Sequence, residues 1–255
     1  MLKKTLCLLT IFTMGTAAAH ARQPKQYTYT VVKSYPHDRN AYTQGLFFHE
    51  GMLYESSGQY GYSNVRKSDL ATGKVLQALN IPRQYFAEGS CVLHGKLYLL
   101  TWQEHTCFVY DIRTFKQLGT LQYPTQGWGL TTNGTQLIMS DGTATLYFRH
   151  PDTFAEQRRI TVRNNNKPVQ YLNELEYING EIWANVYTTD QIVRIDPKDG
   201  TVLGVIDLTN LLPRNLRTAK TDVLNGIACD AATGRLIVTG KNWPKLYEIA
   251  VSEKK

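Results

Sequence analysis

A unit of about 40 residues recurs along the chain, and this repeat restricts the possible folds more than any other feature. Each copy contains a turn glycine followed by apolar and aromatic residues, at Gly51, Gly95, Gly134, Gly180 and Gly234. Downstream, a short strand-like stretch ends in an Asp-containing turn, with spacings of 42, 41 and 44 residues between Asp69, Asp111, Asp152 and Asp196. Asp side chains accept hydrogen bonds from backbone N–H groups two residues later, so they suit such corners.

A repeat of this length with four strands is typical of a β-propeller blade. Five copies therefore predict an all-β fold, a five-bladed β-propeller. The fifth copy ends at 246–251 and lacks its last strand, while residues 27–35 alternate as a strand does. We expect this N-terminal strand to pair with the fifth copy and close the ring, which also covers an exposed edge. One short turn or helix is expected within 207–218. An open sandwich of similar strands is the alternative, and the even spacing disfavours it.

The first 21 residues have the layout of a secretory signal peptide. Lys3 and Lys4 precede an apolar run, and small residues lead up to Ala21. The apolar run is too short to span a bilayer as a stable helix, so a retained anchor is the less favoured alternative. We expect a signal peptide at 1–21 and a single propeller domain at 22–255. The mature protein is then exported, periplasmic or secreted, without a membrane anchor. Cleavage after Ala17 or Ala19 stays open.

The charge pattern argues against nucleic acid as a partner. Loss of Lys3 and Lys4 on export lowers the formal net charge from +7 to +5. The remaining basic residues are scattered, whereas nucleic-acid binding requires a basic patch or stripe, with aromatic residues between the charges where bases stack. A basic but soluble surface is the simpler interpretation.

No metal or cofactor is expected. The mature cysteines are Cys91, Cys107 and Cys229, and the absence of C-x-x-C disfavours a zinc or thioredoxin-type site. Cys91 and Cys107 are predicted on neighbouring strands and could bridge in an oxidising compartment, although buried thiols are favoured. The histidines form no H-E-x-x-H motif and no pair at ligand spacing. A structural calcium ion held by channel carbonyls cannot be read from side chains and stays open.

Polar residues stand at equivalent positions where each repeat begins, namely Gln44, Glu88, Trp128, Asn173 and Asn225. In a symmetric ring such positions converge on the axis. One carboxylic acid with several amides and a Trp is typical of a pocket for a small polar substrate. The alternative is that these side chains only tie turns together through hydrogen bonds to the backbone. Trp183 and Trp243 are expected to pack between blades.

Several longer stretches resemble the glutaminyl-peptide cyclotransferases of plant and bacterial type. They are Tyr42-Thr-Gln-Gly-Leu, Phe86-Ala-Glu-Gly, Gly127-Trp-Gly-Leu, Asn173-Glu-Leu-Glu-Tyr-Ile-Asn-Gly-Glu-Ile-Trp-Ala-Asn-Val and Thr239-Gly-Lys-Asn-Trp-Pro-Lys-Leu. The resemblance runs from about Tyr27 to Ile249. It implies a five-bladed propeller with a narrow central channel. It also implies an enzyme that converts N-terminal glutamine of peptides or proteins to pyroglutamate with release of ammonia. We expect it to act as a monomer.

The resemblance also implies the site residues. The catalytic glutamate is Glu88. The substrate-binding residues are Gln44, Tyr42, Phe86, Trp102, Trp128, Asn173, Tyr187 and Lys241. Tyr187 is a departure, because plant members often have Trp there. It keeps an aromatic wall but adds a hydroxyl, which puts its substrate role in doubt.

The chemistry needs a group that moves a proton from the attacking amine to the departing nitrogen, and one carboxyl group can do both in turn. Enclosure by aromatic residues would raise the pKa of Glu88, and Lys241 would lower it if close. Two other functions stay open. One is a non-catalytic periplasmic propeller that binds peptides or scaffolds an envelope complex. The other is a calcium-dependent propeller lactonase or hydrolase, for which the clustered acids are lacking.

Overall fold

The computed structural model describes residues 23–254, so the expected signal peptide at 1–21 lies outside the described residues. The fold is all-β. The helical content of residues 23–254 is one 3₁₀ turn, η1 (Arg214–Leu216), within the segment where the sequence predicted a short turn or helix. Within the described range, no helix is both long and apolar enough to cross a membrane.

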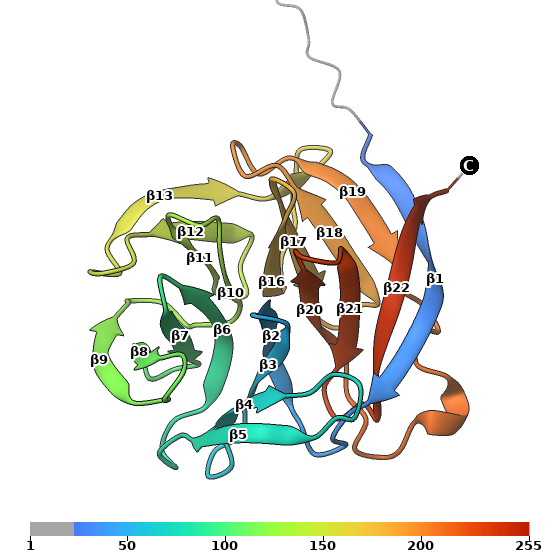
Figure 1. The fold of residues 1–255 in the computed structure, drawn as a ribbon. Coiled ribbons are helices and arrows are strands. Elements are labelled where there is room, and N and C mark those ends of the chain that lie inside the picture. The colour runs from blue at the N-terminus through green and yellow to red at the C-terminus, as the bar shows by residue number, and fades with distance from the viewer. Residues whose placement is uncertain (1–22, 255) are drawn as a thin grey trace, which may run out of the picture.

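Three sheets of four antiparallel strands follow one another along the chain (Figure 1). The first contains β2 (Thr43–His49), β3 (Met52–Ser57), β4 (Asn64–Ser68) and β5 (Val75–Asn80). The second contains β6 (Ala87–Leu93), β7 (Lys96–Thr101), β8 (Thr106–Asp111) and β9 (Gln117–Gln122). The third contains β10 (Leu130–Thr132), β11 (Leu137–Ser140), β12 (Thr145–Arg149) and β13 (Glu156–Thr161). A small hairpin follows, made of β14 (Arg163–Asn164) and β15 (Lys167–Pro168).

The remaining strands form one sheet of eight, in the order β16-β17-β18-β19-β1-β22-β21-β20. One half contains β16 (Leu172–Ile178), β17 (Glu181–Val186), β18 (Gln191–Ile195) and β19 (Val202–Asp207). The other half contains β20 (Leu224–Asp230), β21 (Arg235–Gly240), β22 (Lys245–Glu253) and β1 (Lys25–Pro36). The last three strands of the chain thus complete a set of four with the first.

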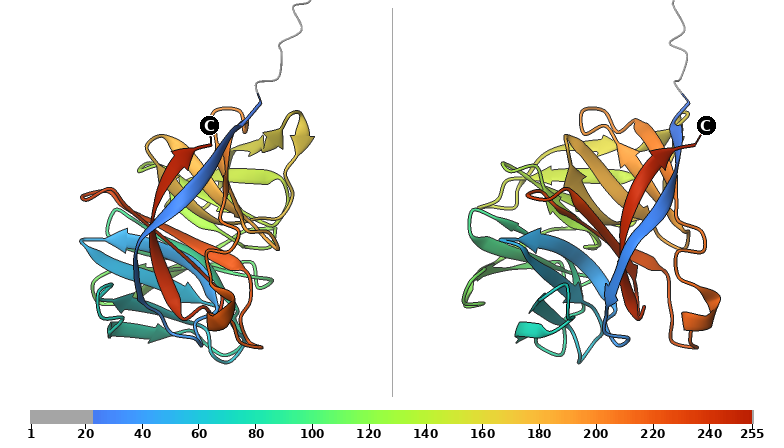
Figure 2. Two further views of the ribbon diagram at one scale, coloured as in Figure 1. Left: turned by 90° about the vertical axis from the view of Figure 1, so that its right-hand side faces the viewer. Right: turned by 45° about the vertical axis from the view of Figure 1, so that its right-hand side comes forward.

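The pairing of the N-terminal strand with the last repeat is confirmed. β1 runs antiparallel to β22 from Tyr27 opposite Glu253 to Pro36 opposite Lys245, and Figure 2 shows the two strands side by side. The sequence did not predict that the start of β1 also pairs in parallel with β19, which merges two sheets. Without their antiparallel pairing β1 and β22 would each expose an unpaired strand edge, and each strand therefore covers the edge of the other.

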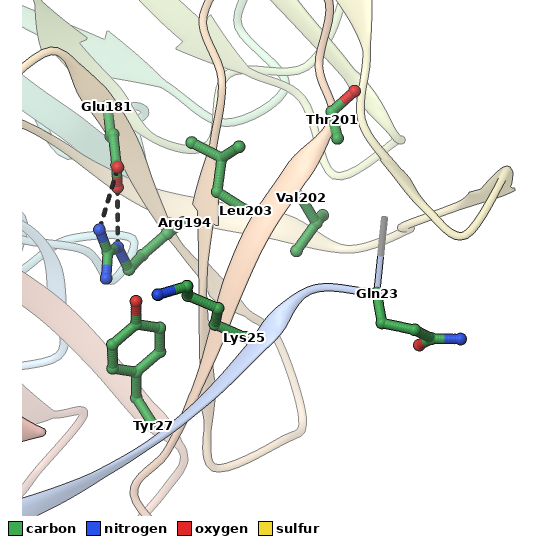
Figure 3. A pocket seen from close by; sticks show the side chains of 8 residues that line it. All are labelled: Gln23, Lys25, Tyr27, Glu181, Arg194, Thr201, Val202 and Leu203. Carbon is green, nitrogen blue, oxygen red and sulfur yellow. Dashed lines mark hydrogen bonds and ion pairs between the residues drawn. The ribbon is translucent and has the colours of Figure 1, made fainter. Parts of the chain in front are cut away.

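A second set of contacts fixes β1 to the neighbouring strands (Figure 3). Arg194 makes two hydrogen bonds to Glu181, of 2.7 and 2.9 Å, and its guanidinium lies 4.6 Å from the ring centre of Tyr27. A planar guanidinium that is held in place by a carboxylate can also stack on an aromatic face. The ion pair on β17 and β18 thereby anchors the first residues of the closing strand.

The first strands of successive sheets lie next to one another in a closed series, β2 with β6, β6 with β10, β10 with β16, β16 with β20, and β20 with β2. Among the described residues the hydrophobic core is divided into five clusters, and each cluster combines residues of two neighbouring sets of four strands; one of them lies between the two halves of the eight-stranded sheet. Phe47 of β2 shares one cluster with Leu99 of β7, for example, and Met139 of β11 shares another with Tyr98 of β7. The four-stranded sets therefore pack face to face around a common axis, and Trp183 and Trp243 are buried between the two halves of the eight-stranded sheet.

The turn chemistry agrees with the sequence except in the third repeat. Asp69, Asp111 and Asp196 accept backbone N–H bonds within their turns, each at 2.8 Å. Asp152 does not, and forms an ion pair with Lys96 instead. The equivalent position is His150, whose carbonyl accepts the i+4 N–H as those of the three Asp residues do. The assignment of Asp152 to the repeat was therefore wrong by two positions, because a His ring nitrogen supplies the acceptor there.

The cysteine placement needs a second correction. Cys91 lies on β6 and Cys107 on β8, so β7 separates the two strands that the sequence placed as neighbours. Both are buried free thiols, and Cys229 is a partly buried free thiol. Burial raises the pKa of the Cys91 and Cys107 thiols, which keeps them protonated and unreactive.

Candidate active site

The site is formed where the first strand of each sheet begins. Gln44, Glu88, Asn173 and Asn225 are each the second residue of their strand. In all four strands the register with the next strand shifts at this point. A β-bulge redirects side chains and is frequent near active sites. The repeated bulge explains why equivalent positions converge on the axis.

The structure brings all nine predicted site residues to one pocket of about 280 Å³. Its lining residues are Tyr42, Gln44, Gln59, Phe86, Glu88, Trp102, Trp128, Asn173, Tyr187 and Lys241. Gln59 is the member that the sequence did not predict, because it lies in the loop after β3 rather than at a repeated position. A pocket of this size is at the small end of ligand sites, which span about 300–1,000 Å³.

Glu88 is buried in this pocket, with 4 % of its surface exposed. Burial raises the pKa of its carboxyl well above the usual range, Lys241 opposes this shift, and Glu104 adds to it. Its Oε1 accepts a 3.0 Å hydrogen bond from Gln44 Nε2, and Gln44 Oε1 accepts a 3.3 Å bond from Asn225. Glu88 Oε2 has no partner among the described residues, so this oxygen is left for a bound molecule.

Lys241 is the cation of the pocket. Its ammonium lies 4.7 Å from the ring centre of Tyr42 and 5.1 Å from that of Tyr187. Burial lowers its pKa, and the carboxylates of Glu88 and Asp222 oppose that effect. Tyr42 donates a 2.9 Å hydrogen bond to Asp222, which fixes one face of this cage. The hydroxyl of Tyr187 therefore does not remove the aromatic wall, because the ring contacts both Lys241 and Trp128.

Aromatic rings enclose the rest of the pocket in edge-to-face contacts. Phe86 contacts Tyr42 and Trp102 with ring centres 6.2 and 5.7 Å apart, and Trp128 contacts Tyr187 at 5.6 Å. Such pairs are the favoured geometry for aromatic side chains. The wall excludes water from Glu88, which is the cause of its raised pKa.

Glycines allow the inner strands to approach the axis closely. A Cβ at Gly89 would come within 2.4 Å of the Leu130 nitrogen, and one at Gly129 within 2.0 Å of the Asn173 oxygen. Gly89 also donates a 2.7 Å hydrogen bond to the Trp128 carbonyl. The glycine that follows each of these site residues is therefore required by the contact between sheets.

A buried His–Glu pair lies beside the pocket and holds the strand that carries Gln44. His37 Nδ1 lies 2.7 Å from the Trp243 carbonyl, and its Nε2 lies 3.0 Å from Glu55 Oε1. Thr43, adjacent to Gln44, donates a 2.6 Å bond to the same carboxylate. Burial alone would lower the pKa of His37, but Glu55 outweighs it and the net pKa is raised. The His37 side chain thus ties the end of β1 to Glu55 of the first sheet and to the Trp243 carbonyl between β21 and β22.

The sequence interpretation missed Glu174, which stands where the four other repeats have glycine. Its carboxylate accepts backbone N–H bonds from Leu46 at 3.1 Å and Ile227 at 2.8 Å, across the axis. Burial raises its pKa well above the usual range. The motif that carries the family resemblance contains Glu174, and the missing glycine at this repeated position is the signal that could have identified it.

A second hollow contains an acid that is already paired. In the hollow of Figure 3, Glu181 and Arg194 neutralise each other through paired hydrogen bonds. Among residues 23–254, no three His, Cys, Asp or Glu side chains cluster as they would around a metal ion. The axial pocket is thus the place where the described residues combine one unpaired buried acid, amides and an aromatic wall. These features define a class: an all-β protein with the pocket of an acid–base enzyme for a small polar group.

Comparison with known proteins specifies that class. The family model described as glutamine cyclotransferase matches residues 4–251, so the chain belongs to the glutamine cyclotransferase family. A glutaminyl-peptide cyclotransferase of Arabidopsis thaliana is 47 % identical over 227 residues, which cover 88 % of this chain and 71 % of that protein.

Two solved structures are also similar. The glutaminyl cyclase of Myxococcus xanthus has a TM-score of 0.85 and 35 % identity, covering 91 % of this chain and 100 % of that one. The WD40 β-propeller domain of Doa1 has a TM-score of 0.50 and 12 % identity, covering 80 % of this chain and 62 % of that one. At that identity the second likeness concerns the fold alone.

Proposed function

We propose that the axial pocket cyclises the N-terminal glutamine of peptides or proteins to pyroglutamate and releases ammonia, with Glu88 as the catalytic residue. The observation that carries this proposal is a single buried carboxyl with a raised pKa and one free oxygen, enclosed by aromatic and amide side chains. Membership of the glutamine cyclotransferase family supports it. The pocket suits one terminal residue rather than a chain segment.

The reaction is internal to the substrate. The α-amine nitrogen attacks the side-chain carboxamide carbon, a C–N bond forms, and the bond to the carboxamide nitrogen breaks. Holding the side chain folded in that pose can supply about 7–11 kcal/mol of the barrier reduction. The aromatic wall of Phe86, Trp102 and Trp128 is placed to hold it.

Glu88 then moves the proton. As a carboxylate it takes the proton that the attacking amine must lose, and it delivers this proton to the departing nitrogen, which leaves as ammonia. The carboxylate is restored at the end of each turnover. The raised pKa brings the carboxyl nearer to ambient pH, where one group exchanges a proton in both directions most readily.

The remaining polar groups orient the substrate. Lys241 is positioned to stabilise negative charge that develops on the carboxamide oxygen, as a cation in a water-poor site does. Gln44 fixes one oxygen of Glu88 and so directs the other to the substrate. The buried Asn173 Oδ1 has no partner among the described residues and is available to accept from the substrate's amine.

We further propose that the closed series of sheets is a five-bladed propeller in one domain at 22–255. Support comes from the five inter-sheet cores and from β1 completing the last set of four strands. The expected export through a signal peptide at 1–21, to the periplasm or outside, stays part of this proposal, as does a monomeric mature form without an anchor. Activity without a cofactor is likewise proposed.

Ammonia release from a Gln-initiated peptide, with and without a chelator, tests the function. Ammonia and a pyroglutamyl product in both arms support it. Binding without turnover would instead support a peptide-binding scaffold, and loss of activity with the chelator would overturn cofactor independence.

A further inference from the structure

We propose that Gln126 is a positioning residue that sets the orientation of both tryptophans in the pocket wall. This inference rests on the proposed function for its catalytic consequence, but its structural part can be measured separately. Gln126 does not line the pocket itself and is exposed.

One oxygen joins the two indoles. Trp102 Nε1 donates to Gln126 Oε1 at 2.8 Å, and Trp128 Nε1 donates to the same atom at 3.0 Å. An indole nitrogen is only a donor, and an amide oxygen has two lone pairs, so this arrangement uses both acceptor sites. It also fixes which way the amide of Gln126 points.

The two tryptophans come from different sheets. Trp102 follows β7, and its backbone N–H donates to Phe86 at 3.0 Å. Trp128 precedes β10, and its backbone N–H donates to Ser140 at 3.0 Å. These bonds hold the main chain, and ring contacts with Phe86 and Tyr187 support the indoles, but the Nε1–H groups of both indoles are fixed jointly by Gln126.

The bridge also determines the chemistry of the wall. With both N–H groups bound to Gln126, the two rings present π faces and C–H edges to the pocket. A released N–H would compete with Lys241 for the substrate's carboxamide oxygen and favour unproductive poses. Because small misplacements of positioning groups strongly reduce turnover, the effect should fall mainly on kcat.

The test compares three variants. Gln126→Leu keeps the approximate size but removes the acceptor, and Gln126→Glu restores an acceptor. Gln103→Leu is the matched control, since Gln103 is exposed beside Trp102 and makes no side-chain hydrogen bond among the described residues. Each is assayed for ammonia release from a Gln-initiated peptide, and the indole N–H resonances are recorded by NMR.

We expect Gln126→Leu to lower kcat about tenfold with a smaller change in KM, and to shift two of the four indole N–H resonances. Gln126→Glu should restore most of the kcat and of the indole N–H resonance positions, and Gln103→Leu should leave kcat and these resonances unchanged. Unshifted indole resonances in Gln126→Leu would overturn the bridge. Shifted resonances with normal kcat, or equal losses in Gln126→Glu, would overturn its role in positioning. If the unmodified protein releases no ammonia, the proposed function fails, while the resonances still report on the bridge.

Discussion

Replacing Glu88 by Gln removes the proposed proton carrier with little change in shape. The amide oxygen of the new side chain can still accept the 3.0 Å hydrogen bond from Gln44. The aromatic wall that holds the folded substrate is untouched. What is lost is the ability to take a proton from the amine and return it to the leaving nitrogen.

General acid–base catalysis contributes about 10²–10⁴-fold. At about 1.36 kcal/mol for each tenfold step, this equals roughly 2.7–5.4 kcal/mol of transition-state stabilisation. We therefore expect kcat for ammonia release to fall by that factor, with KM almost unchanged because the binding surface remains. A coupled ammonia assay at saturating Gln-initiated peptide measures this directly.

Stability should not account for the loss. Because burial raises the pKa of Glu88, the folded protein binds this proton more tightly than the unfolded chain, and the carboxyl lowers stability as pH rises above its usual 4.5. A neutral amide lacks that penalty, so the melting temperature at neutral pH should be equal or higher.

Glu88→Asp is the matched variant. It keeps a carboxyl but withdraws it by roughly 1.5 Å, one C–C bond length. We expect activity between that of the wild type and Glu88→Gln. If Glu88→Gln keeps more than about a tenth of wild-type kcat while folding normally, the proton-carrier role is refuted.

Three further predictions follow from the surroundings of the pocket. Lys241→Met removes the cation that lowers the pKa of Glu88, so the acid limb of the kcat–pH profile should move to higher pH. Lys241→Arg keeps a positive charge and should move this limb less. An unmoved acid limb in Lys241→Met would contradict an effect of Lys241 on the pKa of Glu88. The His37–Glu55 pair raises the pKa of His37, so its contribution to stability is full below about pH 6.5 and is lost as pH rises through the folded-state pKa. His37→Gln should therefore abolish that part of the pH dependence of the free energy of unfolding in urea, and an unchanged pH dependence would contradict a raised pKa of His37 in the folded protein. Gly129→Ala places a methyl group against the Asn173 carbonyl of the next sheet and should lower the free energy of unfolding by about 1–3 kcal/mol. An unchanged free energy of unfolding would mean that the strands of Gly129 and Asn173 can move apart without cost.

Much of the fold could be predicted because the repeat is local. Glycine turns and alternating strands mark each four-stranded unit. The last repeat lacked its fourth strand, and the N-terminal strand was the one strand left to pair with it. The parallel pairing of β1 with β19 was not predictable. It involves Lys25 to Tyr27, at the start of β1, and Lys25 and Gln26 lie before the part of β1 that pairs with β22. The third repeat misled for a different reason: His150 and Asp152 can both accept a hydrogen bond in a turn, and the sequence alone does not choose between them.

The site was predictable to the extent that it follows the repeat. Gln44, Glu88 and Asn173 occupy equivalent bulged positions, so symmetry alone brings them together. Lys241 and Tyr187 follow the ends of later strands, and only the family resemblance pointed to them. Loop residues such as Gln59 and Gln126 carry no periodic signal, and their placement emerges only from the three-dimensional structure.

A departure from the repeat links the inner strands of three strand sets across the axis. Glu174 replaces the glycine found at this position in the other repeats, and its carboxylate binds the N–H groups of Leu46 and Ile227 across the axis. Two residues farther along β16, Glu176 accepts from Cys229 in the same manner. A glycine at either position could not satisfy these backbone N–H groups, because it has no side chain that accepts a hydrogen bond. The two carboxyl groups of β16 therefore hold the inner strands together where direct strand pairing is absent, and this fixes the strands that carry Gln44 and Asn225 beside Glu88.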